Sequence, residues 1–276
     1  MKNDLITSRK NPEVMYAASL LTKKSREREG VFVAEGIKLF TEAVDAGAEP
    51  IRIYLREDKE REYLPVIQRK LGDRICSDGR LFILSESAFE KISSENAPQG
   101  IISVIKSLDI FKKCIKIYKK DFLSFEGERI LALCSVRDPG NLGAIIRSAV
   151  AFGFDRLLLS DDCAELTNPK TVRAAMGALF KLPTVTVSDF SSVFSAARDA
   201  GRRVFCAELT DDAVSITDTE LRASDVVVIG NEGHGIPSDY SRLASGSVYI
   251  PIAPNTESLN AAVAASILLW ELGRKE

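Results

Sequence analysis

Residues 226–237, which read VVVIGNEGHGIP, decide the class of fold. Four consecutive apolar residues indicate a strand that is covered on both faces, a pattern typical of parallel sheets. A glycine-rich segment begins where this strand ends, and ligands of open α/β sheets bind beyond the carboxyl ends of the strands. The stretch therefore predicts a parallel α/β domain with a binding loop after this strand.

Apolar runs on both sides of this stretch extend the α/β pattern over the chain. In the second half we expect strands at residues 130–136, 156–159, 203–207, 226–229 and 248–250, and helices at 142–152, 171–179, 191–200, 237–244 and 259–272. In the first half we expect strands at 31–34, 51–55, 81–84 and 101–104, and helical segments at 15–21, 37–46, 63–71 and 85–92. The lysine-rich residues 106–128 lack a pattern, which predicts domains at 1–105 and 129–276 joined by a 106–128 linker.

The composition is that of an ordinary globular protein, with 276 residues, 45% hydrophobic residues and a net charge of −2. The sequence contains no apolar run of ~18 residues, so no membrane-spanning helix is expected. Its start lacks the apolar core of a secretory signal. Five scattered cysteines and one histidine, His234, predict neither a disulfide framework nor a metal site. We therefore expect a cytoplasmic protein.

Lysine and arginine gather in two places. Residues 1–28 hold seven of them against three acids, and a second cluster consists of Lys112, Lys113, Lys116, Lys119 and Lys120. Such clusters bind phosphate backbones by releasing counterions. Runs this short fit a solvated surface equally well, so both interpretations stay open.

The loop after the strand at 130–136 leads into a helix. Asp138 and Pro139 form a turn there, and Asn141 is the expected N-cap of the helix. A helix N-terminus presents free amides to a phosphate. Arg147 follows one turn after Gly143, and its side chain leans back toward that end. A capped helix with one surface arginine would have the same pattern.

The two other loops follow later strands. The loop 230–235 carries Glu232 among three glycines, but it is neither a dinucleotide fingerprint nor a Walker loop. A nucleotide-dependent oxidoreductase is therefore disfavoured, and His234, between two glycines, is expected to be exposed rather than a catalytic base. The third loop begins at Pro251 and places Ser258, Leu259 and Asn260 before an alanine-rich helix.

Together the three loops resemble the three motifs of SpoU-type methyltransferases of the SPOUT superfamily. The first motif is matched by Asp138, Pro139, Asn141, Gly143 and Arg147. The second is matched by Gly230, Glu232, Gly233 and Gly235, and the third by Ile250, Pro251, Ser258, Leu259 and Asn260. Residues 8–12, 34–36 and 98–100 resemble the SpoU substrate-binding domain, a ribosomal-protein-like α/β RNA-binding fold.

The resemblance implies a fold, a cofactor and an assembly. The C-terminal domain would be an α/β trefoil knot, and the protein a homodimer with the helix from Leu142 and the last helix at the interface. S-adenosylmethionine would be bound by Gly230, Gly233, Gly235, Ile250, Ile252, Ser258 and Leu259. The catalytic set would be Arg147, Asn141, Glu232, Ser258 and Asn260, with no metal.

The implied reaction is methyl transfer from S-adenosylmethionine to a ribose 2′-hydroxyl of structured RNA. An N-terminal domain of this type is commoner in rRNA enzymes, which favours large-subunit rRNA over tRNA. A non-catalytic RNA-binding protein of the same fold is the other alternative, although Asn141, Arg147 and Asn260 are all present. Because a guanidinium pKa above ~12 forbids a neutral base, we expect Arg147 to bind a phosphate and stabilise the developing alkoxide.

Overall fold

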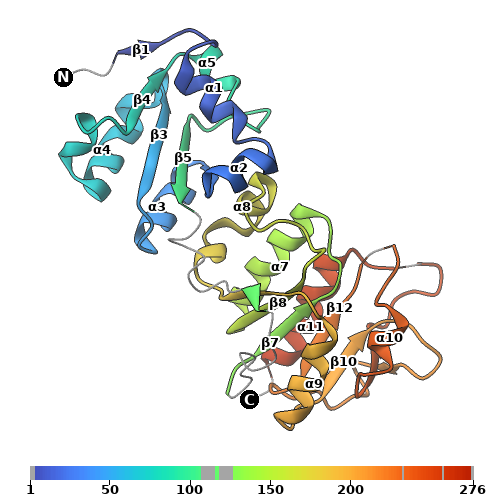
Figure 1. Ribbon diagram of the computed structural model, residues 1–276. Coiled ribbons are helices and arrows are strands. Elements are labelled where there is room, and N and C mark those ends of the chain that lie inside the picture. The colour runs from blue at the N-terminus through green and yellow to red at the C-terminus, as the bar shows by residue number, and fades with distance from the viewer. Residues whose placement is uncertain (1–3, 107–115, 118–126, 232, 257, 275–276) are drawn as a thin grey trace. The chain divides into compact units, whose positions relative to one another are not determined.

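The computed structural model describes residues 4–106, 116–117, 127–231, 233–256 and 258–274. It divides into two compact units, the first made of Met1–Lys112 with Thr167–Phe180 and the second of Lys113–Leu166 with Lys181–Glu276. Each unit has a sheet with helices packed on it (Figure 1). Across the described ranges, no helix is long and apolar enough to cross a membrane.

The first unit contains a mixed sheet of five strands in the order β1-β4-β3-β5-β2. Strands β1, β4 and β3 are parallel, whereas β5 is antiparallel to both β3 and β2. All four strands expected in this half are present. The strands are β1 (Leu5–Ile6), β2 (Val31–Glu35), β3 (Pro50–Arg56), β4 (Leu81–Leu84) and β5 (Ile101–Lys106), and the helices are α1 (Pro12–Ser19), α3 (Ile37–Asp45), α4 (Glu60–Leu71) and α5 (Glu86–Glu90), with short 3-10 turns at Glu57–Lys59 and Asp73–Cys76.

One helix of this unit, α2 (Lys23–Glu29), was not expected, because its sequence KKSRERE has no apolar period. Thr22 caps its start, and Gly30 ends it with a φ of 65°. Arg26 is only 2% exposed and donates to the carbonyls of Leu20 and Leu21, both at 3.0 Å. Tertiary burial of this arginine, rather than an amphipathic pattern, stabilises α2.

The segment Thr167–Phe180 belongs to the first unit, although a helix at 171–179 was expected in the second domain. It forms α8 (Pro169–Ala175) and a 3-10 turn, η5 (Met176–Phe180). The ring of Phe180 lies 6.3 Å from that of Phe32 in β2. This contact is between distant parts of the sequence, which local patterns cannot reveal.

The second unit contains eight parallel strands in the order β11-β13-β10-β12-β7-β8-β9-β6. The five expected strands are present, and three short ones, β6, β9 and β11, were not expected. Strand β6 lies within the expected linker and pairs with β9. The strands are β6 (Lys116–Ile117), β7 (Ile130–Leu133), β8 (Arg156–Ser160), β9 (Thr184–Val187), β10 (Val204–Ala207), β11 (Val214–Ser215), β12 (Val226–Ile229) and β13 (Gly246–Tyr249).

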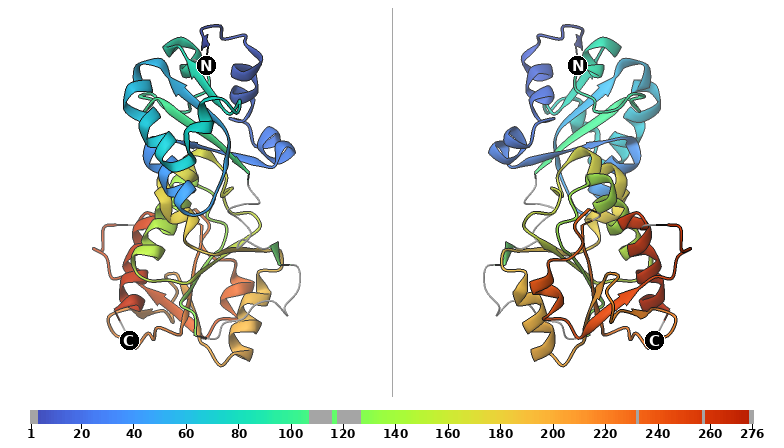
Figure 2. Two further views of the ribbon diagram at one scale, coloured as in Figure 1. Left: turned by 90° about the vertical axis from the view of Figure 1, so that its left-hand side faces the viewer. Right: turned by 90° about the vertical axis from the view of Figure 1, so that its right-hand side faces the viewer.

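Helices cover both faces of this sheet: α7 (Pro139–Ala151), α9 (Ser191–Asp199), α10 (Ser238–Ser241) and α11 (Ala261–Gly273). Figure 2 shows α9, in orange, and α11, in red, on opposite sides of the sheet. Two contacts show that helices α7 and α11 run in the same direction. Ser148 Oγ lies 2.8 Å from Ser266 Oγ, and one turn later in both helices the rings of Phe152 and Trp270 lie 5.9 Å apart. Since all eight strands are parallel, their carboxyl ends share one edge.

Candidate functional site

The first-motif helix, α7, begins earlier than expected. Asp138, not Asn141, is its N-cap, and the Asp138 Oδ1 accepts from the backbone amide of Asn141 at 2.8 Å. Pro139 follows at the first helical position, which its fixed φ favours. The expectation that Asn141 caps the helix is therefore wrong. A carboxylate occupies the place where free amides were expected to meet a phosphate, so this helix end is a poorer anion site.

Arg147 is exposed on α7, whereas the neighbouring residues Ile145 and Ile146 are buried. Its guanidinium forms no ion pair or hydrogen bond with any residue that the structure describes. Gly143, one turn earlier, is buried in the same helix. The side chain is therefore presented to solvent with its donors available for an external anion.

The first and third motifs meet through two asparagines. Asn260 donates from its Nδ2 to Oδ1 of Asn141 at 3.0 Å. The Oδ1 of Asn260 also caps α11 by accepting from the amides of Ala262 (3.0 Å) and Val263 (3.3 Å). Asn260, expected in the catalytic set, thus contacts Asn141 of that set and caps its own helix.

A cavity of about 720 Å³ lies beyond the carboxyl ends of β10, β12 and β13. One expected site residue, Gly233, is not brought to it, and its amide instead donates to Oδ1 of Asn231 at 2.8 Å. Glu232 lies outside the described residues. Arg147, Asn141 and Asn260 do not line it either. The expected residues that do line it are Gly230, Gly235, Ile250, Ile252, Ser258 and Leu259.

Two glycines of the second motif, Gly230 and Gly235, are required by the chain itself. A Cβ on Gly230 would lie 2.5 Å from the carbonyl carbon of Gly235. The backbones of Asn231 and Gly235 exchange two N–H···O hydrogen bonds, with N···O distances of 3.1 and 2.9 Å. Gly235 has a φ of 66°. The close neighbour of Gly230 is therefore backbone of the same turn.

Sequence reasoning missed one charged residue in the cavity wall, Glu208. It follows β10 and is partly buried, and its two carboxylate oxygens accept from the hydroxyls of Ser241 (3.0 Å) and Ser247 (2.7 Å). The signal was a lone acid directly after an apolar strand. His234 also lines the cavity and is exposed, as expected.

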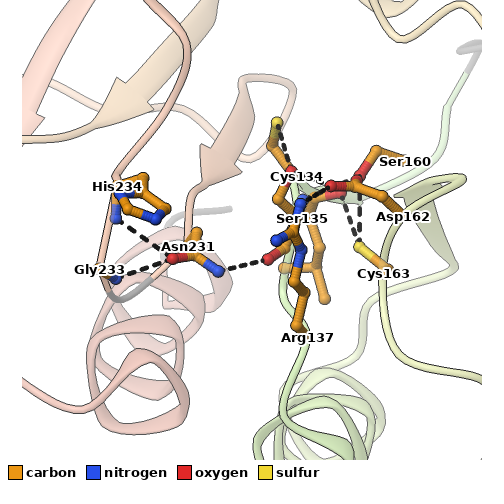
Figure 3. A network of polar contacts seen from close by, with 10 residues as sticks. Cys134, Ser135, Arg137, Ser160, Asp162, Cys163, Asn231, Gly233 and His234 are labelled. Atoms are coloured by element: carbon orange, nitrogen blue, oxygen red, sulfur yellow. Dashed lines mark hydrogen bonds and ion pairs between the residues drawn. The ribbon is translucent and has the colours of Figure 1, made fainter.

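A polar network lies next to the cavity, at the ends of β7 and β8 (Figure 3). At its centre is Asp162, which accepts from the hydroxyls of Ser135 and Ser160, both at 2.6 Å, and from Arg137 at 2.8 Å. Partial burial alone would raise the pKa of Asp162, but these hydrogen bonds and the charge of Arg137 lower it to about 2. The sequence analysis did not single out this group.

Two family models match different parts of the chain. Residues 128–270 match the SpoU rRNA Methylase family, and residues 11–103 match the MRM3-like substrate binding domain. The 23S rRNA (guanosine(2553)-2′-O)-methyltransferase RlmP of Bacillus subtilis is 28% identical over 97% of this chain and 98% of its own. The 23S rRNA (uridine(2479)-2′-O)-methyltransferase of Streptomyces viridochromogenes is 30% identical over 98% of this chain and 92% of its own.

A solved structure agrees with these relatives. The AdoMet-bound rRNA methyltransferase from Sinorhizobium meliloti has a TM-score of 0.80 and 29% identity, over 97% of this chain and 96% of that one. The family match and this solved relative, together with the parallel sheet and its three motif loops, identify an RNA methyltransferase of the SPOUT class. The chain belongs to the SpoU rRNA methylase family.

Proposed function

We propose that this chain transfers a methyl group from S-adenosylmethionine to a ribose 2′-hydroxyl of large-subunit ribosomal RNA. The observation that carries the proposal is the cavity formed by the second and third motifs, joined to the Arg147-bearing helix by the Asn141–Asn260 hydrogen bond. The names of the 23S rRNA relatives support the choice of RNA.

The cavity fits the methyl donor. Its volume of about 720 Å³ lies within the usual ~300–1,000 Å³ of small-molecule sites. Ile229, Ile236 and Leu268 provide apolar wall for an adenine ring, and Glu208 and Thr256 provide polar atoms for hydroxyl or ammonium groups. When bound, S-adenosylmethionine supplies a methyl group already activated by its sulfonium. The proposal needs no metal, and among the described residues no group of three or more His, Cys, Asp and Glu could hold one.

In this proposal the protein positions the ribose and stabilises charge. Arg147 binds a phosphate beside the reacting ribose and stabilises the 2′-oxygen as it becomes negative. Because an arginine side chain carries only hydrogen-bond donors, the proton passes to an RNA phosphate or to water. Asn141 and Asn260, fixed by each other, orient the ribose; Ser258 fixes the third loop. Glu232 is assigned to holding Arg147 or the substrate.

The RNA would be held by residues 1–105, joined through the 106–128 linker to the methyltransferase domain at 129–276. The matched substrate-binding domain and the basic residues of 1–28 support this division. A tRNA substrate remains the competing candidate, since a Synechocystis relative 27% identical over 98% of this chain is named a tRNA/rRNA methyltransferase. Methyl-transfer assays on rRNA and on tRNA distinguish these two candidate substrates.

Three further properties belong to the proposal. The methyltransferase domain would be a trefoil knot, as its family membership supports. Two copies would pair through α7 and α11, because Val263 (48% exposed) and Trp270 (57% exposed) lie two helical turns apart on one face of α11. The protein would act in the cytoplasm, and the four cysteines that the structure describes, Cys76, Cys134, Cys163 and Cys206, are free thiols.

Calorimetry and a transfer assay test the proposal together. Titrated into the full chain with a chelator and without RNA, S-adenosylmethionine should bind at one site per chain. With donor labelled in its methyl group, label should appear on the 2′-oxygen of rRNA. Absence of binding by both S-adenosylmethionine and its demethylated product would refute the donor assignment.

A further inference from the structure

Asn231 lies between the cavity and the first-motif turn. It follows β12, the strand between β10 and β7 in the sheet, and it lines the cavity. Its Nδ2 donates to the carbonyl of Ser135, 96 residues away, at 2.8 Å, and its Oδ1 accepts from the amides of Gly233 (2.8 Å) and His234 (3.2 Å) (Figure 3). One side chain therefore closes the glycine turn and ties it to the neighbouring strand end.

Ser135, the partner of Asn231, has a φ of 58°, a left-handed conformation that is rare for a residue with a side chain. Its surroundings maintain this strain. Its amide donates to Ser160 Oγ at 2.8 Å, its hydroxyl donates to Asp162 at 2.6 Å, and its carbonyl accepts from Asn231. Strained backbone that is held by contacts on every polar group is typical of functional sites.

The series of hydrogen bonds that begins at Asn231 and passes through Ser135 ends at the charged carboxylate of Asp162. Asp162 receives hydrogen bonds on both carboxylate oxygens, from Ser160 on Oδ1 and from Ser135 and Arg137 on Oδ2. The connection therefore runs from a fixed carboxylate after β8, through the end of β7, to the turn after β12. It stays within one unit of the protein.

Besides this side chain, the described residues of the glycine turn are held by the two backbone hydrogen bonds between Asn231 and Gly235. Gly233, His234 and Gly235 are all exposed, and a glycine-rich exposed turn has many alternative conformations. Loss of the support should therefore disturb the shape of the cavity wall much more than the stability of the buried sheet.

We propose that Asn231, held by Ser135, is a positioning residue that sets the conformation of the glycine turn at Gly233, His234 and Gly235 and thereby the affinity for the methyl donor. This inference rests on the proposed function, because it assumes that the cavity binds that donor. It assigns roles to Asn231, Ser135 and Asp162, which lie outside the catalytic and cofactor-binding sets named above.

The test compares Asn231→Asp and Asn231→Ala in the full-length chain. Aspartate keeps an oxygen for the two turn amides but sets a second oxygen against the Ser135 carbonyl; alanine removes both kinds of contact. Calorimetric titration with S-adenosylhomocysteine should show a Kd at least tenfold higher for aspartate and higher still for alanine. Thermal unfolding without ligand should shift by only a few degrees.

Asn168→Asp is the matched control. Asn168 caps α8 by accepting from the amide of Lys170 at 2.9 Å and does not line the cavity, so this variant should bind with the wild-type Kd. Should either Asn231 variant fail to fold, Ser135→Ala replaces it. That variant keeps the carbonyl, loses the bond to Asp162 and should bind several-fold more weakly.

The outcomes distinguish failure of the positioning role of Asn231 from failure of the proposed function. A Kd within twofold of wild type in the folded Asn231 variants, or in Ser135→Ala if those do not fold, overturns the positioning role and leaves the proposed function intact. Failure of the wild-type chain to bind S-adenosylhomocysteine overturns the proposed function and this inference with it. A raised Kd that the Asn168 control shares also overturns the positioning role, since any such exchange would then have the same effect.

Discussion

Asn260 donates a hydrogen bond to Asn141, which lies 119 residues earlier in the chain, at 3.0 Å. The bond joins the first turns of α7 and α11, and Ser148 and Ser266 repeat the pairing further along the same two helices. Through it the helix that bears Arg147 is fixed relative to the loop of Ser258 and Leu259 in the cavity wall.

The asparagine pair should be coupled both in stability and in activity. Asn260→Ala removes the cap of α11, which should cost about 1 kcal/mol. Asn141→Ala keeps that cap and should cost less. Urea unfolding of both single variants and the double variant gives the coupling energy. Strictly additive losses, in both unfolding and single-turnover rate, would show that the bond has no role in either.

Arg147→Ala should abolish methyl transfer and leave cofactor affinity within a few-fold of wild type, because Arg147 does not line the cavity. Arg147→Lys should restore little activity, since lysine keeps the charge and loses the planar fork that grips a phosphate. Single-turnover rates at saturating donor and RNA measure both effects. Arg242→Ala, at a 76% exposed arginine of a surface ion pair, is the control. Near-normal rates for the Arg147 variants would remove this residue from the active site.

Asp162 should make stability depend on pH at the acid end. Folding lowers the pKa of Asp162 from 3.8 to about 2, so its stabilisation is complete above pH ~4 and is lost as the pH falls toward 2. The side chain is 38% exposed, so we expect about 1 kcal/mol, less than the full conversion of the shift. Urea unfolding of wild type and Asp162→Asn should converge between pH 4 and 2. A constant difference across that range would contradict the assignment.

Trp270→Lys should separate a dimer into folded monomers. The indole is 57% exposed and contacts Phe152, so its replacement should leave the monomer folded while placing a charge in the proposed interface. Sedimentation velocity measures the change. Leu209→Lys, at a residue 79% exposed on the cavity rim, is the control and should stay dimeric. A wild-type chain that is monomeric at micromolar concentration would contradict the interface.

Long apolar patterns and capping residues were sufficient to predict much of the fold. The strand at 226–229 appears where the sequence indicated, and the helical segment expected at 85–92 is present as α5, with Ser85 as its cap. Short or polar elements were missed: β9 reads TVTV and α2 reads KKSRERE, and both are stabilised by tertiary contacts. Local pattern also misplaced the α7 cap by three residues, because Asp138 and Asn141 are both good caps.

The sequence predicts those parts of the candidate site that directly follow strands, and it does not predict the contacts between them. The motif residues that line the cavity each follow a strand, and strand ends are visible in the sequence. Contacts between such ends are not. Asn231 and Ser135 are 96 residues apart, and Glu208 meets Ser247 only because β10 and β13 pair.

The central claim is tested most directly by mapping ribose 2′-O-methylation in the rRNA and tRNA of cells that lack the gene and of cells in which it is restored. One large-subunit rRNA position should lose its methyl group on deletion, regain it with the wild-type gene, and remain unmethylated with the Arg147→Ala gene. A tRNA position that follows this pattern would move the substrate to tRNA. Identical 2′-O-methylation maps in all strains would contradict the account.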